Sequence, residues 1–149
     1  SEANCMTGRY FVDTNVLVYA RDASESTKQP QAQAWLAWLW QHRNGCVSTQ
    51  VLQEFYQTVT RKLQPGLAPA VARAEVRDFG AWYPMTIDGP VMERAWVLED
   101  RHQFSWWDAL IIAAAGLAEC NFLLTEDLQA DQQIDKLRII NPFDNPPPV

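Results

Sequence analysis

Apolar residues occur along the chain in two patterns, short runs and longer stretches with helical spacing. The short runs predict strands at residues 10–12, 46–48, 84–87, 121–125 and 137–140. Helical spacing predicts helices at residues 15–21, 50–63, 68–82, 91–102 and 105–117, and one more from Pro30 to the Asn44-Gly45 pair. Because parallel strands need crossover connections, strands separated by helices predict an α/β fold with a mainly parallel sheet and helices on both faces.

Length and composition predict one domain. The chain has 149 residues, of which 48% are hydrophobic, enough to bury a core. We expect a domain at residues 9–143, a leader or tag remnant at residues 1–8, and a loose Pro-rich tail at residues 144–149. No run is long enough to cross a membrane and no signal-peptide pattern precedes the first strand, so the expected location is cytoplasmic.

Several chemistries are disfavoured by the residues present. The three cysteines are odd in number and widely spaced, which predicts reduced thiols rather than disulfides or a zinc site. His42 and His102 form no metal-binding pair, and no glycine-rich phosphate loop is present. The formal net charge of −6 argues against a surface that binds nucleic acid everywhere, although it leaves room for a local basic rim. The candidates for such a rim are Arg61, Lys62, Arg73, Arg77, Arg94 and Arg101, each of which also fits a solvated surface.

Three carboxylates are expected at one edge of the predicted sheet. Asp13 directly follows the first strand, Asp127 follows the strand at 121–125, and Asp108 stands in the first turn of an otherwise apolar helix. In an open parallel sheet this edge is where ligands bind. Each acid also has a structural alternative, since Asp13 could cap the next helix, Asp127 could begin a turn, and Asp108 could form a capping box with Ser105.

Glu54 is a fourth candidate, because it flanks the apolar stripe of its helix with no Lys or Arg three or four residues away. Solvent exposure is its alternative explanation. Two unit charges about 4 Å apart repel by around 4 kcal/mol at an effective dielectric near 20, so four converging acids require a cation. Oxygen ligands without nearby His or Cys favour a hard ion, Mg²⁺ or Mn²⁺.

Four segments carry a further signal, namely YFVDTNVLVYARD, STQVLQEFYQTVTRKL, SWWDALIIAAAGLAECNFLLTEDLQ and LRIINPF. Together they resemble the PIN-domain ribonucleases, most closely the toxins of VapBC-type bacterial toxin–antitoxin pairs, and the likeness runs in order from about residue 9 to residue 143. The resemblance implies a three-layer αβα sandwich, a homodimer, and a cognate antitoxin whose tail crosses the active-site groove. It also implies an RNA substrate.

The family's acidic positions coincide with those chosen from the residues alone. The resemblance assigns the metal-binding and catalytic acids to Asp13, Glu54, Asp108 and Asp127, and the supporting polar positions to Thr14, Asn15, Ser105 and Thr125. Many relatives carry glycine where this chain has Glu119, and glycine or a similar turn residue where it has Asp131. Glu126 and Asp131 therefore remain alternatives to Asp127 as the fourth acid.

The sequence therefore predicts a metal-dependent endoribonuclease in which the acids hold Mg²⁺ or Mn²⁺ and the ion activates water without a histidine base. Aspartyl-phosphate chemistry is disfavoured, because Asn15 stands where it needs a second acid. The alternative from another class is a PIN-like module that docks a protein or RNA partner with little activity. Trp38, Trp40, Trp106 and Trp107 could line a dimer or antitoxin surface, although core packing is the favoured reading for each.

Overall fold

The computed structural model describes residues 8–149 and contains a five-stranded sheet with the order β2-β1-β3-β5-β4. The strands are β1 (Tyr10–Val12), β2 (Gly45–Cys46), β3 (Phe122–Leu124), β4 (Gln133–Ile134) and β5 (Leu137–Ile140). β1 pairs in parallel with β2 and β3, and β3 pairs in parallel with β5. Only β4 is antiparallel among the described strands, and it is paired to β5. The predicted mainly parallel sheet is confirmed.

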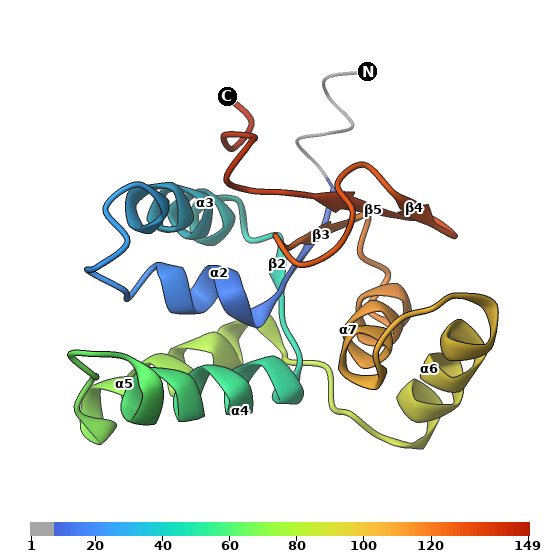
Figure 1. Ribbon diagram of the computed structural model, residues 1–149, viewed down its shortest axis with the longest axis horizontal. Helices are drawn as coiled ribbons and strands as arrows, with labels where there is room; N and C mark the ends of the chain where they lie inside the picture. The colour runs from blue at the N-terminus through green and yellow to red at the C-terminus, as the bar shows by residue number, and fades with distance from the viewer. Residues whose placement is uncertain (1–7) are drawn as a thin grey trace.

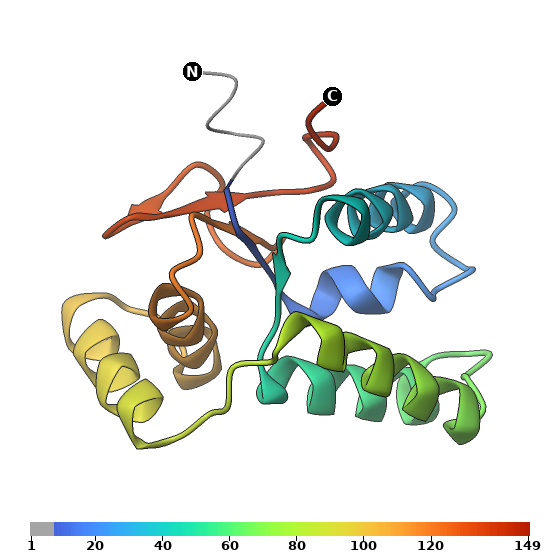
Figure 2. The same ribbon diagram turned by 180° about the vertical axis from the view of Figure 1, so that it is seen from behind.

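Helices lie on both sides of this sheet. They are α2 (Thr14–Tyr19), α3 (Lys28–His42), α4 (Thr49–Gln57), α5 (Pro69–Asp78), α6 (Gly89–Arg101) and α7 (Trp106–Leu117). A π-helical turn, Thr58–Lys62, extends α4, and a 3₁₀ turn, Phe79–Trp82, extends α5. In Figures 1 and 2, α2 and α3 lie on one side of the strands and α6 and α7 on the other. This is the predicted αβα sandwich.

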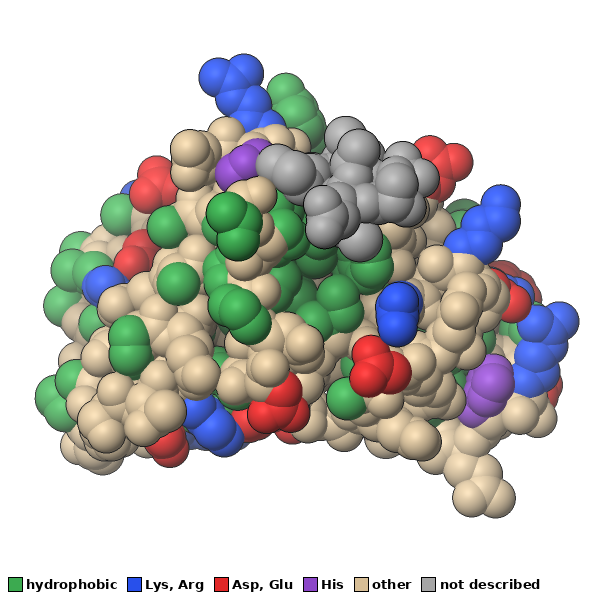
Figure 3. Space-filling view, turned by 90° about the horizontal axis from the view of Figure 1, so that it is seen from above, with side chains coloured by type: hydrophobic (Ala, Val, Ile, Leu, Met, Phe, Trp, Pro, Cys, Tyr) green, Lys and Arg blue, Asp and Glu red, His purple; other side chains and the backbone are tan. Residues whose placement is uncertain are grey.

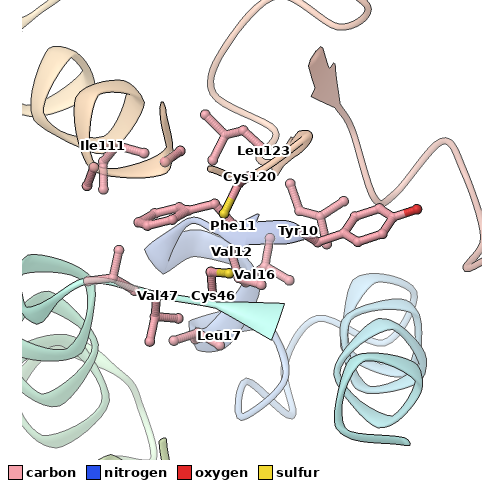
Figure 4. Close-up of a cluster of buried hydrophobic side chains, with 14 of the residues drawn as sticks. Tyr10, Phe11, Val12, Val16, Leu17, Cys46, Val47, Ile111, Cys120 and Leu123 are labelled. Atoms are coloured by element: carbon pink, nitrogen blue, oxygen red, sulfur yellow. The ribbon is translucent and has the colours of Figure 1, made fainter. Parts of the chain in front are cut away.

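Side chains of β1 alternate between the two sides of the sheet, as strand geometry requires. Phe11 points toward Ile111 of α7, whereas Tyr10 points to the opposite side, where its ring contacts Trp35 and Trp38 of α3 (Figure 4). Both Tyr10 and Phe11 are buried. A three-residue strand with neighbours on both edges and helices on both faces is thus fixed at the centre of the core. Its last residue is followed directly by Asp13.

Two parts of the sheet differ from the prediction. Residues 84–87 do not form a strand, because only Met85 pairs, in an isolated parallel bridge with Ser48. Pro84 has no backbone N–H to donate, and Asp88 already caps α6 through the backbone N–H of Val91, so no room is left for a longer ladder. β4 was not predicted, since two residues carry too little pattern to be recognised.

The chain ends also differ in part from expectation. Residues 1–7 of the predicted leader, including Cys5, lie outside the described residues. The first part of the tail is not loose, because the indole N–H of Trp35 donates to the carbonyl oxygens of Pro142 at 3.1 Å and Asn145 at 2.8 Å. Cys46 and Cys120 are buried free thiols, as predicted. No helix in residues 8–149 has the length and apolarity needed to cross a bilayer.

The four tryptophans proposed as surface candidates separate into two groups. Trp38 is 8% exposed and packs in the core, which confirms the favoured interpretation and leaves it unavailable to a partner. Trp106 is half-buried and stacks on Trp96, whereas Trp40 and Trp107 are exposed, Trp107 by 62%. Trp38 is buried because its ring contacts Tyr10 of β1 and stacks on His42 at the end of α3.

Candidate active site

Asp13 is placed at the carboxyl end of the central strand and at the start of the next helix. It caps α2, where one carboxylate oxygen accepts a hydrogen bond from the backbone N–H of Thr14 at 2.7 Å. The other oxygen accepts from the hydroxyl of Thr125 at 2.8 Å, and only 6% of the residue is exposed. Asp13 therefore caps α2, as the structural alternative predicted, and the same hydrogen bonds hold its carboxylate in a fixed position.

Asn15 connects two of the acids. Its side-chain amide nitrogen lies 3.0 Å from an Asp127 carboxylate oxygen, 3.4 Å from Asp13 Oδ2 and 3.2 Å from Thr125 Oγ1. The Thr125 hydroxyl oxygen also accepts from the backbone N–H of Asp127 at 3.1 Å. One neutral amide and one hydroxyl thus bring the acid after β1 and the acid after β3 together, as the topology of the sheet predicted.

Glu54 of α4 joins the same group from the neighbouring helix. Its carboxylate accepts from the Thr14 hydroxyl at 2.7 Å and from the side-chain amide of Gln50 at 3.1 Å. The Gln50 amide also lies 3.4 Å from the carbonyl oxygen of Trp107, which links α4 to the first turn of α7. Gln50 is buried, and sequence reasoning missed it. The available signal was a polar residue one helical turn before Glu54.

Asp108 occupies the first turn of α7, where the Ser105 side chain caps the helix by accepting from the backbone N–H of Asp108 at 3.1 Å. The capping alternative is therefore real for Ser105, while the Asp108 carboxylate itself remains half-buried. Burial raises its pKa, the hydrogen bond from Ser105 opposes this, and the charges of Asp127 and Glu54 raise it further.

The pKa of Asp13 reports the same neighbours. Burial raises this pKa from 3.8 to about 6, against the hydrogen bonds from Thr125 and Thr14, and the charges of Asp127 and Glu54 add to the rise. Asp13 and Asp108 thus respond to the same two carboxylates. The four acids from four separate segments form one electrostatic group.

Glu126 and Asp131, the alternatives for the fourth acid, have other partners. Glu126 accepts from Lys28 at 2.7 Å and from the Tyr19 hydroxyl, and Lys28 lowers its pKa against the opposing effect of burial. Asp131 is exposed and lies 3.6 Å from Arg138. Asp131 and Glu119, where relatives carry glycine, both have the left-handed backbone conformation, with φ of 64° and 58°. Both departures from the family pattern therefore occur at positions where the backbone is left-handed.

The donor set fits a hard divalent cation in its chemistry. All four side chains offer carboxylate oxygens, and none of the ion pairs within residues 8–149 neutralises any of them. The four side chains do not form a complete coordination shell, because no group of three or more His, Cys, Asp or Glu in the described part of the chain is arranged to ligate an ion. Mg²⁺ usually keeps several waters, so such an open arrangement suits it.

Two of the basic residues considered for a rim interact with other side chains. Arg94 pairs with Asp135, and the Arg73 guanidinium donates to the Tyr56 hydroxyl at 3.1 Å. On the face seen in Figure 3, Lys and Arg side chains are scattered among acidic and neutral ones.

The comparisons agree with this fold. The fold is an α/β sandwich with acids at the carboxyl edge of its sheet. The PIN domain family model matches residues 10–135, so the chain belongs to the PIN domain family. The crystal structure of VapC20 from Mycobacterium tuberculosis, described as a sarcin–ricin loop cleaving toxin, is similar in fold. It has a TM-score of 0.55 and 23% sequence identity over 79% of this chain and 91% of that chain. No curated protein sequence matches significantly.

Proposed function

We propose that this protein is a divalent-metal-dependent endoribonuclease and the toxin of a bacterial toxin–antitoxin pair. The observation that carries the proposal is the burial of Asp13 beside the charges of Asp127 and Glu54, with only neutral hydrogen-bond donors around it. Such a group destabilises the folded protein at neutral pH, and a bound cation would offset that cost. Membership of the PIN domain family supports the same assignment.

In this proposal Asp13, Glu54 and Asp108 hold Mg²⁺ or Mn²⁺ directly or through water, with Asp127 completing the group. A bound divalent ion lowers the pKa of water and offsets charge on the scissile phosphate. Thr14 holds Glu54, and a wider set of polar groups keeps the other carboxylates in place, namely Asn15, Ser105 and Thr125. The Ser105 cap fixes the start of α7, and the raised pKa of Asp108 suits a carboxylate that orients the attacking water.

The partners follow from the family and from the fold neighbour. The described neighbour cleaves the sarcin–ricin loop, and an RNA hairpin of that sequence is the first substrate to test here. We further propose a homodimer and a cognate antitoxin that covers the acidic site. Exposed Trp107 lies one residue from Asp108, where an antitoxin segment crossing the site would contact its ring.

The experiment is cleavage of that RNA hairpin with Mg²⁺, with Mn²⁺ and with EDTA. We expect products with either ion and none in EDTA, and we expect Asp13→Ala and Asp108→Ala to lose cleavage at least a hundredfold while keeping wild-type circular dichroism. Asp144→Ala, at an exposed position near the C-terminus, is the matched control and should cleave normally. RNA binding without metal-dependent cleavage would instead establish the partner-docking alternative.

The fourth acid is tested by a pair of neighbouring substitutions. Asp127→Asn should lower the cleavage rate tenfold or more, because Asp127 shares the Asn15 amide with Asp13. Glu126→Gln should change the rate by less than threefold, since Glu126 is directed to Lys28 and Tyr19. The reverse order of effects would assign the role to Glu126.

A further inference from the structure

A second candidate site lies at the opposite edge of the sheet from the acids. It is a hollow of about 860 Å³, which we call the basic hollow, and its lining includes Arg9, Arg43, Asn44, Trp40, Trp82 and Tyr83. Arg9 precedes β1 and Asn44 precedes β2, whereas Asp13 follows β1. Four residues of extended chain separate Arg9 from Asp13 by about 13 Å. The volume is in the range of small-ligand sites.

The charge of the basic hollow is opposite to that of the chain as a whole. The protein has 18 acidic and 12 basic side chains, yet no Asp or Glu lines this hollow. Neither Arg9 nor Arg43 belongs to an ion pair within residues 8–149. One guanidinium nitrogen of Arg9 lies 3.0 Å from the Cys46 sulfur, which holds this side chain against β2. Two arginines without carboxylate partners favour an anionic ligand.

Two buried polar atoms belong to residues that line the same hollow. Within residues 8–149, the side-chain oxygen of Asn44 and the indole nitrogen of Trp82 have no hydrogen-bond partner, although the residues are only 9% and 8% exposed. Asn44 donates through its amide nitrogen to the carbonyl of Gly8, so its oxygen is left as an acceptor. An unpaired buried acceptor and an unpaired buried donor are costly, and both belong to residues that line the hollow.

Two aromatic residues of the hollow, Tyr83 and Trp40, are exposed. Tyr83 is 90% exposed and has φ of 50°, a left-handed conformation that is unfavourable for a bulky residue. Trp40 is also exposed, and its ring packs against Trp82 with 4.8 Å between centroids. Exposed aromatic faces beside arginines are the combination on which nucleobases stack while phosphates are held.

We propose that the basic hollow binds one nucleotide, with its phosphate between Arg9 and Arg43 and its base against Tyr83 and Trp40. The nucleotide is either free or one unit of a single-stranded RNA. In the RNA form the proposal rests on the proposed ribonuclease function, and the hollow acts as a second contact that holds the substrate away from the cleavage site. The recognition chemistry is the same in both forms.

The test measures binding in EDTA, where metal-dependent cleavage is absent. AMP, a short single-stranded RNA and inorganic phosphate are titrated separately into ¹⁵N-labelled wild-type protein. The indole N–H resonance of Trp82, assigned with Trp82→Phe, reports on the hollow. We expect AMP or the RNA to shift this resonance, and inorganic phosphate to bind at least tenfold more weakly. Binding of only one of the two nucleotide probes identifies whether the natural ligand is free or part of a chain.

Variants separate this site from general charge effects. Arg43→Glu should weaken nucleotide binding tenfold or more, as expected for loss of a charge-assisted contact. Arg101→Glu, an equal charge change at an exposed position outside the hollow, should stay within twofold. Tyr83→Asn, which tolerates positive φ, should weaken AMP but not phosphate.

The proposal is overturned if the Trp82 resonance does not move at millimolar AMP or RNA, if phosphate alone binds as tightly as AMP, or if the two arginine variants behave alike. A failure of this kind leaves the cleavage assay unaffected. Absence of cleavage likewise leaves nucleotide binding in EDTA intact.

Discussion

Replacing Asp13 by asparagine should make the metal-free protein more stable at neutral and alkaline pH. The buried carboxyl has a pKa of about 6, against 3.8 for an ordinary aspartate. Roughly two pKa units correspond to about 3 kcal/mol at about 1.4 kcal/mol per unit. Asparagine keeps an acceptor for the Thr14 N–H but loses the charge-assisted part of the bonds from Thr14 and Thr125, so we expect a net gain of about 1–3 kcal/mol.

The raised pKa of Asp13 also determines how the stability of the folded protein changes with pH. The folded protein binds a proton on Asp13 more tightly than the unfolded chain does, so the stability contributed by this group is fully present below pH 3.8. It is lost as the pH rises through about 6, where the folded carboxyl ionises. The stability difference between Asp13→Asn and wild type should therefore be small at the acidic end, grow across this window and become constant above it.

The assay is urea unfolding in EDTA at a series of pH values, with Asp144→Asn as an exposed control that should follow wild type. Adding Mg²⁺ or Mn²⁺ should stabilise wild type and leave Asp13→Asn nearly unchanged, because the ion binds the folded carboxylate group. A variant less stable than wild type at alkaline pH, or a difference that does not vary with pH, would refute the account of Asp13 as an uncompensated buried charge.

Three further stability predictions concern backbone positions, each measured by urea unfolding. Gly45→Ala should lose about 1–3 kcal/mol, because a Cβ there would lie 2.4 to 2.6 Å from the ring of Trp82; unchanged stability would show that the ring can move away. Gly116→Ala, in α7 with nothing within 4 Å of its Cβ position, should gain about 0.5–1 kcal/mol, and a loss would contradict the open space there. Glu119→Gly should gain up to about 1 kcal/mol by relieving φ of 58°, and a loss would show that the entropy of glycine outweighs the strain.

The sequence predicted the layers and the strands that lie inside them, because buried runs leave a strong pattern. The bounds of β1 and β5 agree residue for residue with prediction. The helix predicted at 50–63 is present but changes to a π-helical turn after Gln57, where the Thr60 hydroxyl donates to the Tyr56 carbonyl at 2.6 Å. Such a local hydrogen bond competes with regular helix geometry without changing the apolar pattern, so periodicity could not reveal it.

The convergence of the acids was predictable from topology, whereas the choice among neighbouring acids was not. Asp13 and Asp127 follow adjacent parallel strands, which places them at one edge whatever their side chains do. Glu126 and Asp127 are adjacent in sequence and differ only in the partners they meet, Lys28 for one and Asn15 for the other. Those partners lie about 100 residues away in the chain, so the distinction depends on the tertiary structure.

The same partners also determine which of the acids keep an uncompensated charge in the folded protein. Lys28 takes up the charge of Glu126, but the hydrogen-bond donors around Asp13, Glu54 and Asp127 are hydroxyls, amides and backbone N–H groups. Neutral donors orient a carboxylate without cancelling its charge, so the repulsion between the acids persists in the folded protein and adds to burial, the main cause, in raising the pKa values of Asp13 and Asp108. An arginine or lysine in the place of Asn15 would remove that repulsion and, with it, the driving force for binding a cation. The stability of the metal-free protein and its affinity for metal should therefore change in opposite directions when these neutral residues are replaced by basic ones.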